Sequence, residues 1–196
     1  AGPADVYHFT NFVIPPLKRG RAIATIFDMS FARLPQCAEA KNLAYLNARM
    51  ARTIARADAI ITISRFSADE IASFHPAAAG KLHVTHLGID PQLKAPAPRV
   101  LSETRRRLGI ERPYILSLGT IEPRKNFPFV AKVFDLLERH DLDLVIAGMP
   151  GWSCEPIFDS FRKAKRAGRI RYLRYVPDAD LPALYAGAEV FVLASL

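Results

Sequence analysis

Short apolar runs alternate along the chain with longer stretches in which apolar residues recur every three or four positions. The short runs cannot complete a helix and predict buried strands. They lie at 7–9, 22–26, 58–63 and 82–87 in the first half, and at 114–118, 142–147, 169–173 and 190–193 in the second. The helical spacing is clearest over 38–57, where it describes one buried face. Strands that alternate with helices predict an α/β fold in which each half forms a parallel sheet.

Polar residues mark the expected starts of three helices. Ser67 and Glu70 have the spacing of a capping box, which predicts the start of a short helix. Ser102 is expected to cap a helix over 103–108. Asn126 is a favourable N-cap for a third helix. The buried face of this third helix is expected to contain Val130, Val133, Phe134 and Leu137.

The middle of the chain is rich in proline. Residues 91–100 include three prolines and show no apolar periodicity. We therefore place a linker at 93–101, between a first domain over 1–92 and a second over 102–196. Both domains are expected to be Rossmann-like and incomplete, since the chain stops on an apolar strand that no helix follows. Two such domains are expected to form a ligand cleft at the carboxyl ends of their strands.

The segment Gly119-Thr-Ile-Glu-Pro-Arg-Lys-Asn126 joins a predicted strand to a predicted helix. A helix N-terminus offers unpaired N–H groups and the positive end of the helix dipole, and both attract anions. Arg124 suits bidentate contact with phosphate oxygens, and Lys125 adds a movable point charge. A solvated basic loop is the competing interpretation, because neither a Walker pattern nor a dinucleotide-binding glycine pattern is present.

Basic residues outnumber acidic residues by 27 to 19, which gives a formal net charge of +8. This charge favours acidic partners: phosphorylated small molecules, an anionic membrane surface or nucleic acid. Composition does not rank the three, although no nucleic-acid-binding motif occurs. No apolar run approaches the roughly 20 residues that span a bilayer. Cys37 and Cys154 have no metal-binding spacing and are expected to be reduced thiols of a cytoplasmic protein.

Two residues of the first half are candidates for ligand contact because each lies near the end of a predicted strand. His8 is followed by Thr10 and Asn11, and a purely structural histidine is the competing interpretation. Asp28 follows the second strand, and a hydrogen bond to its own loop is an equally good explanation. The other histidines have no partner in the pattern and are expected to be structural: His75, His83, His86 and His140.

These motifs together resemble one known family. The segment 119–126 and the later Tyr175-Val-Pro-Asp178 are similar to two elements of the group-1 retaining GT-B glycosyltransferases, and within them of mannosyltransferase-like members. Thr25-Ile-Phe-Asp-Met-Ser-Phe31 is similar to the family's Thr-x-His-Asp-Leu-Ser-Phe stretch. The resemblance covers nearly the whole chain and extends to the segments 5–12, 62–67 and 86–90.

The resemblance implies transfer of a sugar, mannose-like, from a nucleotide-diphosphate donor with retention of configuration and without a metal or other cofactor. A GDP-sugar is favoured as the donor, and a glycan or lipid-linked molecule is expected as the acceptor. From the residues themselves we expect a cytoplasmic protein, peripheral at the inner face of the membrane, with no nucleic-acid partner. Arg124 and Lys125 would hold the diphosphate and stabilise its charge as it leaves.

The remaining site residues are also implied by the resemblance. On the donor side they are Gly119, Thr120, Glu122, Val176 and Asp178. On the acceptor and sugar side they are His8, Asn11, Phe27 and Asp28.

Three features depart from the family's pattern. Phe27 occupies the position of a histidine that contacts the donor sugar. The acidic motif is expected just after Leu196, and a glycine-rich loop is expected before the first residue. The 196 residues alone are therefore expected to be inactive. The alternative hypothesis is a noncatalytic α/β module whose basic surface binds an acidic partner.

Overall fold

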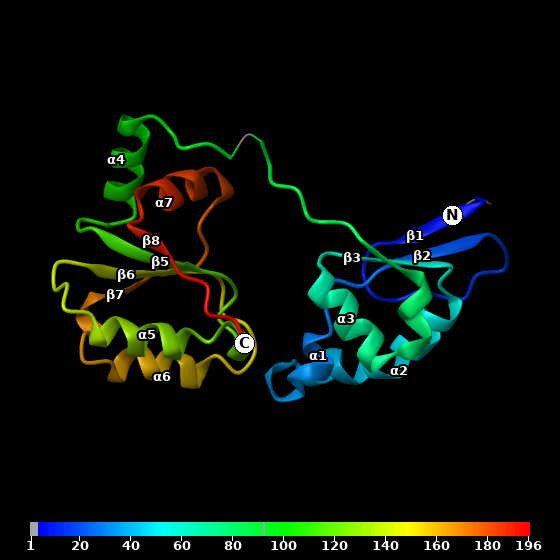
Figure 1. The fold of residues 1–196 in the computed structure, drawn as a ribbon. Coiled ribbons are helices and arrows are strands. Elements are labelled where there is room, and N and C mark those ends of the chain that lie inside the picture. Colours follow the sequence, from blue (N-terminus) through cyan, green and yellow to red (C-terminus); the bar gives the residue numbers. More distant parts are fainter. Residues whose placement is uncertain (1–3, 92) are drawn as a thin grey trace. The chain divides into compact units, whose positions relative to one another are not determined.

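The computed structural model describes residues 4–91 and 93–196. The chain divides into two compact units, Ala1–Ile89 (unit 1) and Asp90–Leu196 (unit 2). Figure 1 shows that strands and helices alternate within each unit. Residues 1–3 and 92, which we assigned to the first domain, lie outside the described residues.

Unit 1 contains one parallel sheet whose strand order follows the sequence, β1-β2-β3-β4. The strands are β1 (Val6–Phe9), β2 (Arg21–Thr25), β3 (Ala59–Thr62) and β4 (Leu82–Val84). The helical elements are α1 (Ser30–Arg33), η1 (Pro35–Cys37), α2 (Ala40–Arg56), α3 (Arg65–Phe74) and η2 (Pro76–Lys81). All strand pairs are parallel, as the sequence predicts.

One hydrophobic core holds unit 1 together. Helix α2 contributes Leu46, Met50 and Ile54, which are at most 5% exposed and pack with the inward residues of β2 and β3. Burying each such side chain stabilises the unit by roughly 1.5–3 kcal/mol. The loop between β1 and β2 also joins the core, because the buried Thr53 hydroxyl accepts a hydrogen bond from the Ile14 N–H (3.2 Å). This contact holds the loop that follows β1 against α2.

Unit 2 contains a second parallel sheet, with the order β7-β6-β5-β8. Its strands are β5 (Tyr114–Leu118), β6 (Asp143–Ala147), β7 (Ile170–Tyr172) and β8 (Val190–Phe191). Its α-helices are α4 (Pro98–Arg107), α5 (Phe127–Leu136), α6 (Glu155–Lys163) and α7 (Leu181–Gly187). Short 3-10 turns are η3 (Pro123–Lys125), η4 (Ala167–Arg169) and η5 (Asp178–Asp180).

Helices cover both faces of the unit 2 sheet. In Figure 1, α5 and α6 lie side by side on one face, and α4 and α7 lie on the other. Strands β6 and β7 extend the sheet from one edge of β5, whereas β8 returns to the opposite edge. The strand order therefore changes direction between β5 and β8, and open α/β sheets bind ligands at such a point, outside the carboxyl ends of the strands.

Several local expectations are wrong, although the α/β class is confirmed. Helix α3 begins earlier than the predicted capping box, because Ser64 is its N-cap and accepts a hydrogen bond from the Ser67 N–H (3.0 Å). Ser102 lies inside α4, which starts at Pro98, so its hydroxyl donates to the Pro98 carbonyl (2.9 Å) instead of capping. Residues 98–101 of the expected linker are therefore helical. Val133, expected to be buried, is 40% exposed.

Candidate functional site

Two glycines bring the backbones of unit 2 together where β5 and β6 end. Gly119 and Gly148 have φ angles of +151° and +143°, which side chains rarely adopt. A Cβ atom on Gly148 would lie 1.9 Å from the Gly119 carbonyl oxygen. Only glycine permits this approach, because any side chain would collide with backbone atoms. The structure thus explains why the expected donor-side residue Gly119 is a glycine.

The loops that follow β5 and β6 continue to run together beyond the sheet. Ile121 and Pro150 form a parallel bridge, and the Gly151 N–H donates to the Ile121 carbonyl (3.0 Å). A Cβ on Gly151 would lie 2.7 Å from the methyl carbon of Thr120. Thr120 itself is exposed. The β5 loop is therefore held against a second backbone segment, and its path is fixed on that side.

The two predicted cations lie on this loop and are both half-buried. Arg124 donates to Glu122 (Nη2 to Oε1, 2.7 Å), and the Glu122 residue is only 3% exposed. The Lys125 side chain lies over Gly119, since a Cβ there would be 3.5 Å from the Lys125 Cε. Glu122 orients one cation, while the side chain of the other lies against the backbone at Gly119. Because Glu122 balances the charge of Arg124, the three side chains leave a net positive charge at the carboxyl end of β5.

The start of α5 differs from our expectation. Asn126 is at the N-cap position, but its backbone is left-handed (φ +54°) and its side chain makes no capping hydrogen bond. Its carbonyl instead accepts the N–H groups of Phe129 (3.1 Å) and Val130 (3.4 Å). Pro128 has no N–H to offer. The helix start therefore supplies few free donors, and any anion affinity here comes mainly from the Arg124 and Lys125 side chains.

The structure adds Arg174, which the sequence analysis missed. It follows β7 with a left-handed backbone (φ +57°), which costs energy for a residue with a side chain. Its carbonyl accepts the Gly148 N–H (2.7 Å), and the Tyr172 hydroxyl donates to the Gly148 carbonyl (2.7 Å). Burial raises the pKa of Tyr172, and the positive charge of Arg174 opposes this shift. Arg174 is therefore a third cation near the paired glycines.

No sequence signal marked Arg174, because an arginine after a strand is common and a left-handed backbone is expected mainly for glycine or asparagine. The expected base-side residues lie next in the chain. Val176 is 6% exposed and packs in the core, so a ligand could reach only its backbone. Asp178 is exposed and begins η5. The nearby Asp180 forms two hydrogen bonds with Arg107 (2.9 and 2.6 Å), which join η5 to α4.

The candidate residues of unit 1 divide into two groups. Asn11 and Asp28 line one pocket together. The Asp28 Oδ1 atom accepts the Ser30 N–H (2.8 Å), so the local turn that we considered as the alternative is present. His8 does not line this pocket, and its Nε2 atom is 2.9 Å from the Thr25 hydroxyl. Phe27 packs near Phe12 instead (ring centroids 6.0 Å apart).

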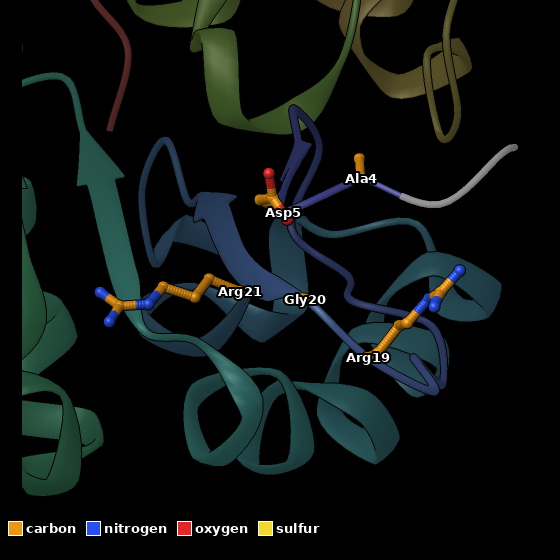
Figure 2. A pocket seen from close by; sticks show the side chains of 5 residues that line it. All are labelled: Ala4, Asp5, Arg19, Gly20 and Arg21. Carbon is orange, nitrogen blue, oxygen red and sulfur yellow. The ribbon is translucent and has the colours of Figure 1, made fainter.

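A second hollow lies at the amino ends of β1 and β2. It is lined by Ala4, Asp5, Arg19, Gly20 and Arg21. Figure 2 shows that the guanidinium groups of Arg19 and Arg21 point in opposite directions, away from a common centre. The basic residues here therefore do not converge on one anion.

Family models match both units of the chain. The model "Glycosyltransferase Family 4" matches residues 4–93, and the model "Glycosyl transferases group 1" matches residues 102–196. The chain belongs to the group 1 glycosyltransferases. The family assignment made from the segment 119–126 and its companion motifs is therefore confirmed.

This group 1 glycosyltransferase is similar to curated mannosyltransferases. It is 31% identical over 97% of its length to the O-antigen chain mannosyltransferase B of Escherichia coli, and it covers 51% of that protein. It is 29% identical over 70% of its length to a GDP-mannose-dependent alpha-(1-6)-phosphatidylinositol monomannoside mannosyltransferase of Mycolicibacterium smegmatis, and it covers 36% of that protein. The chain thus spans about half of the first relative and about a third of the second.

Solved glycosyltransferase structures share the fold. WaaG, a glycosyltransferase involved in lipopolysaccharide biosynthesis, matches with a TM-score of 0.73 and 17% identity over 98% of this chain and 54% of WaaG. Anabaena HepE in complex with UDP-glucose matches with a TM-score of 0.72 and 16% identity over 90% of this chain and 47% of HepE. The GT-B-type class predicted from the sequence is confirmed.

Two further features concern the described residues: membrane-spanning helices and metal-binding groups. Helices long and apolar enough to cross a membrane are not found among them. Nor do three or more His, Cys, Asp or Glu side chains gather in a way that could hold a metal ion.

Proposed function

We propose that this chain takes part in moving a sugar from a nucleotide-diphosphate donor to a glycan or lipid-linked acceptor, with retention of configuration. The observation that carries the proposal is the half-buried cation pair Arg124 and Lys125 beside the point where the unit 2 strand order changes direction. Preorganised cations of this kind stabilise negative charge where it develops, because they need not reorganise at the moment of reaction.

Arg124 and Lys125 bind the two phosphates and stabilise the charge that the diphosphate gains when the sugar bond breaks. Glu122 orients Arg124 through their 2.7 Å hydrogen bond. Gly119 and Thr120 let the donor approach the backbone of the loop that follows β5. Arg174 adds a further positive charge. The backbone of Val176 and the exposed Asp178 lie on the base side. No protonation step of these residues is required, since their task is to hold charge and geometry.

A GDP-sugar with a mannose-like ring is the favoured donor. Two mannosyltransferases, one of them GDP-mannose-dependent by name, are among the relatives and support this choice. His8, Asn11, Phe27 and Asp28 form the acceptor and sugar side in unit 1. The donor is a substrate, and the proposal includes no separate cofactor.

We also propose a cytoplasmic location at the inner face of the membrane. Cys154 is a reduced thiol, which suits a reducing compartment. The net charge of +8 favours contact with an anionic leaflet.

A binding experiment tests the donor site. Titrating the 196-residue chain with GDP, UDP and ADP by calorimetry should show that GDP binds and that it binds most tightly. Replacing both cations (Arg124→Ala with Lys125→Ala) should weaken GDP binding by about tenfold or more, because two charge-assisted contacts are lost. The matched control removes two exposed cations of neighbouring helices (Lys132→Ala with Lys163→Ala) and should change the affinity less than about twofold.

Two results would overturn the donor proposal: no binding of any of the three nucleotides, or equal GDP affinity in the Arg124 and Lys125 double variant. If UDP or ADP binds as tightly as GDP or more tightly, only the choice of base is wrong. Retention is tested separately, on the full-length protein, by the anomeric configuration of the product, which NMR spectroscopy identifies after donor and acceptor are turned over.

The packing of Phe27 supports a second candidate function. Its ring contacts Phe12 and offers no hydrogen bond where family members have a histidine. A noncatalytic module that binds an acidic partner would fit this loss of a polar group. Hydrolysis or transfer of a GDP-sugar by the protein would exclude this second candidate.

A further inference from the structure

We propose that the unit 1 pocket around Asn11 and Asp28 binds one neutral, unphosphorylated sugar ring of the acceptor, and that Asn42 and Tyr45 of α2 recognise it. The inference rests on the proposed function, because that function requires an acceptor. It assigns the acceptor's chemistry and two residues that the sequence analysis did not select.

Three segments build this pocket. The loop after β1 supplies Asn11, Phe12 and Val13; the turn after β2 supplies Asp28, Ser30 and Phe31; and α2 supplies Asn42, Tyr45 and Leu46. Its volume is about 240 Å³. Drug-sized ligands occupy pockets of roughly 300–1,000 Å³, so this pocket suits a smaller molecule such as a single ring.

The polar groups of the pocket match hydroxyl groups. Two side-chain amides, Asn11 and Asn42, each offer donors and an acceptor, and the Ser30 hydroxyl does the same. The Asp28 carboxylate uses Oδ1 for the Ser30 N–H, which fixes its orientation and leaves Oδ2 for the pocket. A ring that carries several adjacent hydroxyl groups can satisfy such a mixture of donors and acceptors.

The pocket also has an apolar component. Tyr45 is 49% exposed although it lines the pocket, and the Arg49 guanidinium carbon lies 5.7 Å from its ring centroid. Phe31 is 6% exposed and contacts Phe12 edge to face (6.2 Å). Phe12 has a left-handed backbone (φ +56°), an arrangement that persists only where the surroundings impose it. Aromatic surface beside carboxylate and amide groups suits a molecule with both C–H and O–H faces.

Charge selects a neutral ligand. The lining residues include no lysine and no arginine, although the chain carries a net charge of +8. Their one carboxylic acid is Asp28, whose negative charge opposes a phosphate group. Arg49 lies over the Tyr45 ring but is not part of the lining. Asp28 is therefore the charged residue in the lining, and it favours an uncharged sugar ring over a nucleotide or sugar phosphate. The pocket thus differs from the cationic loop of unit 2, which is suited to a phosphate group.

Helix α2 holds the two new residues in place. The Asn42 N–H donates to the Glu39 carboxylate (2.7 Å), which caps the first turn of the helix. Leu46 is 5% exposed and belongs to the unit 1 core. Asn42 and Tyr45 therefore project from a capped and anchored helix turn, which reduces the entropy lost when they bind a ligand.

Chemical-shift titration with methyl α-D-mannoside tests this inference on the isotopically labelled chain. We expect millimolar binding with shifts in the amide signals of the three pocket segments. Tyr45→Ala and Asn42→Ala should each weaken this binding at least about threefold, since each removes a direct contact. The control Asn47→Ala changes an exposed amide on the same helix outside the pocket and should leave the affinity unchanged.

Mannose 1-phosphate provides the charged arm of the same titration. The inference is overturned if mannose 1-phosphate shifts the pocket signals as strongly as the neutral sugar, if neither sugar shifts them, or if Tyr45→Ala and Asn42→Ala both bind with the original affinity. Circular dichroism of each variant confirms that the helix is intact.

A GDP titration of the same wild-type sample separates the two proposals. If GDP binds while the neutral sugar does not, the pocket assignment fails and the donor site stands. If the sugar binds to the pocket while GDP does not, the donor proposal fails and the pocket remains a sugar site.

Discussion

The two units place their candidate residues at equivalent positions, the carboxyl ends of parallel strands, yet the chemistry of these positions is opposite. Unit 2 presents Arg124, Lys125 and Arg174 around a pair of glycines. The unit 1 pocket presents amides, a carboxylate and aromatic rings, with no cation in its lining. The carboxyl end of the unit 2 sheet is suited to a diphosphate, and that of the unit 1 sheet is suited to a neutral ring. A repeated architecture therefore does not imply a repeated ligand.

This chemical difference originates in how each of the two sites is built. In unit 2 the backbone itself forms the site, because Gly119 and Gly148 let two loops touch. In unit 1 the loops carry side chains, and a helix, α2, completes the pocket with Asn42 and Tyr45. The unit 2 site should consequently tolerate few backbone changes, and the unit 1 pocket should respond mainly to side-chain changes.

The largest expected effect comes from Gly148→Ala. Its Cβ would collide with the Gly119 carbonyl, and the φ of +143° adds backbone strain. We expect a loss of about 4 kcal/mol or more in the free energy of unfolding of unit 2, together with loss of GDP binding. The chain has one tryptophan, Trp152, which lies in unit 2. Its fluorescence during urea unfolding therefore reports on unit 2 alone.

Gly168→Ala is the matched control, because no atom lies within 4 Å of its added Cβ. Methyl α-D-mannoside should still bind to unit 1 of the Gly148→Ala protein. Equal urea midpoints for Gly148→Ala and wild type would show that the two loops do not need this close approach.

The next effect concerns the internal ion pair of unit 2. Hydrogen bonding to Arg107 lowers the pKa of Asp180 from its ordinary value of 3.8. Its stabilisation is therefore complete above about pH 3.8 and is lost as the pH falls through the lower folded-state pKa. Asp180→Asn should lower the melting temperature of unit 2 by a few degrees at neutral pH, and the difference from wild type should shrink below pH 3.8.

Unit 1 supplies the contrast for this measurement. Its Arg33–Glu70 pair is longer, at 3.6 Å, and the Arg33 side chain is 61% exposed. Glu70→Gln should change the melting of unit 1 little at neutral pH, since a 3.6 Å pair with an exposed arginine contributes little. An Asp180→Asn difference that stays constant down to acid pH would contradict the assigned pKa shift.

The smallest effect is in the salt dependence of the two ligands. Raising sodium chloride from about 0.05 M to about 0.5 M should weaken GDP binding about threefold by screening, whereas methyl α-D-mannoside binding should stay nearly constant. In Arg174→Ala the GDP affinity should fall less steeply with salt than in wild type. Calorimetric titrations at four salt concentrations measure both. Parallel salt dependence for the two ligands would remove the electrostatic contrast between the units.

The sequence predicts most of the fold because the strands are distinctly apolar and short. The eight predicted strands all appear, and each sheet is parallel. Helix starts were less predictable. Ser64 and Ser67 are both good capping residues, and only the three-dimensional path of the chain selects Ser64. Pro98 similarly starts α4 where a proline-rich linker was expected to continue.

The candidate site was predictable where a residue type has a specific chemistry. Arg124 and Lys125 stood out because two cations follow a strand and precede a helix. Three other features depend on tertiary geometry: the left-handed backbone at Arg174, the left-handed cap at Asn126, and the entry of Tyr45 into a pocket. Tyr45 in particular looks like any surface residue of an amphipathic helix until the loops pack beside it.

The strand order of unit 2 has a consequence for synthesis of the chain. A protein emerges from the ribosome from its amino end, and its domains begin to fold before the whole chain is made. In unit 1 each new strand adds to the strand made just before it. In unit 2 the second edge of β5 has no partner until Val190 and Phe191 have emerged, after β6 and β7. An exposed strand edge can pair with another chain, so translation interrupted before residue 190 would leave open an edge of β5 that β8 covers in the folded unit 2.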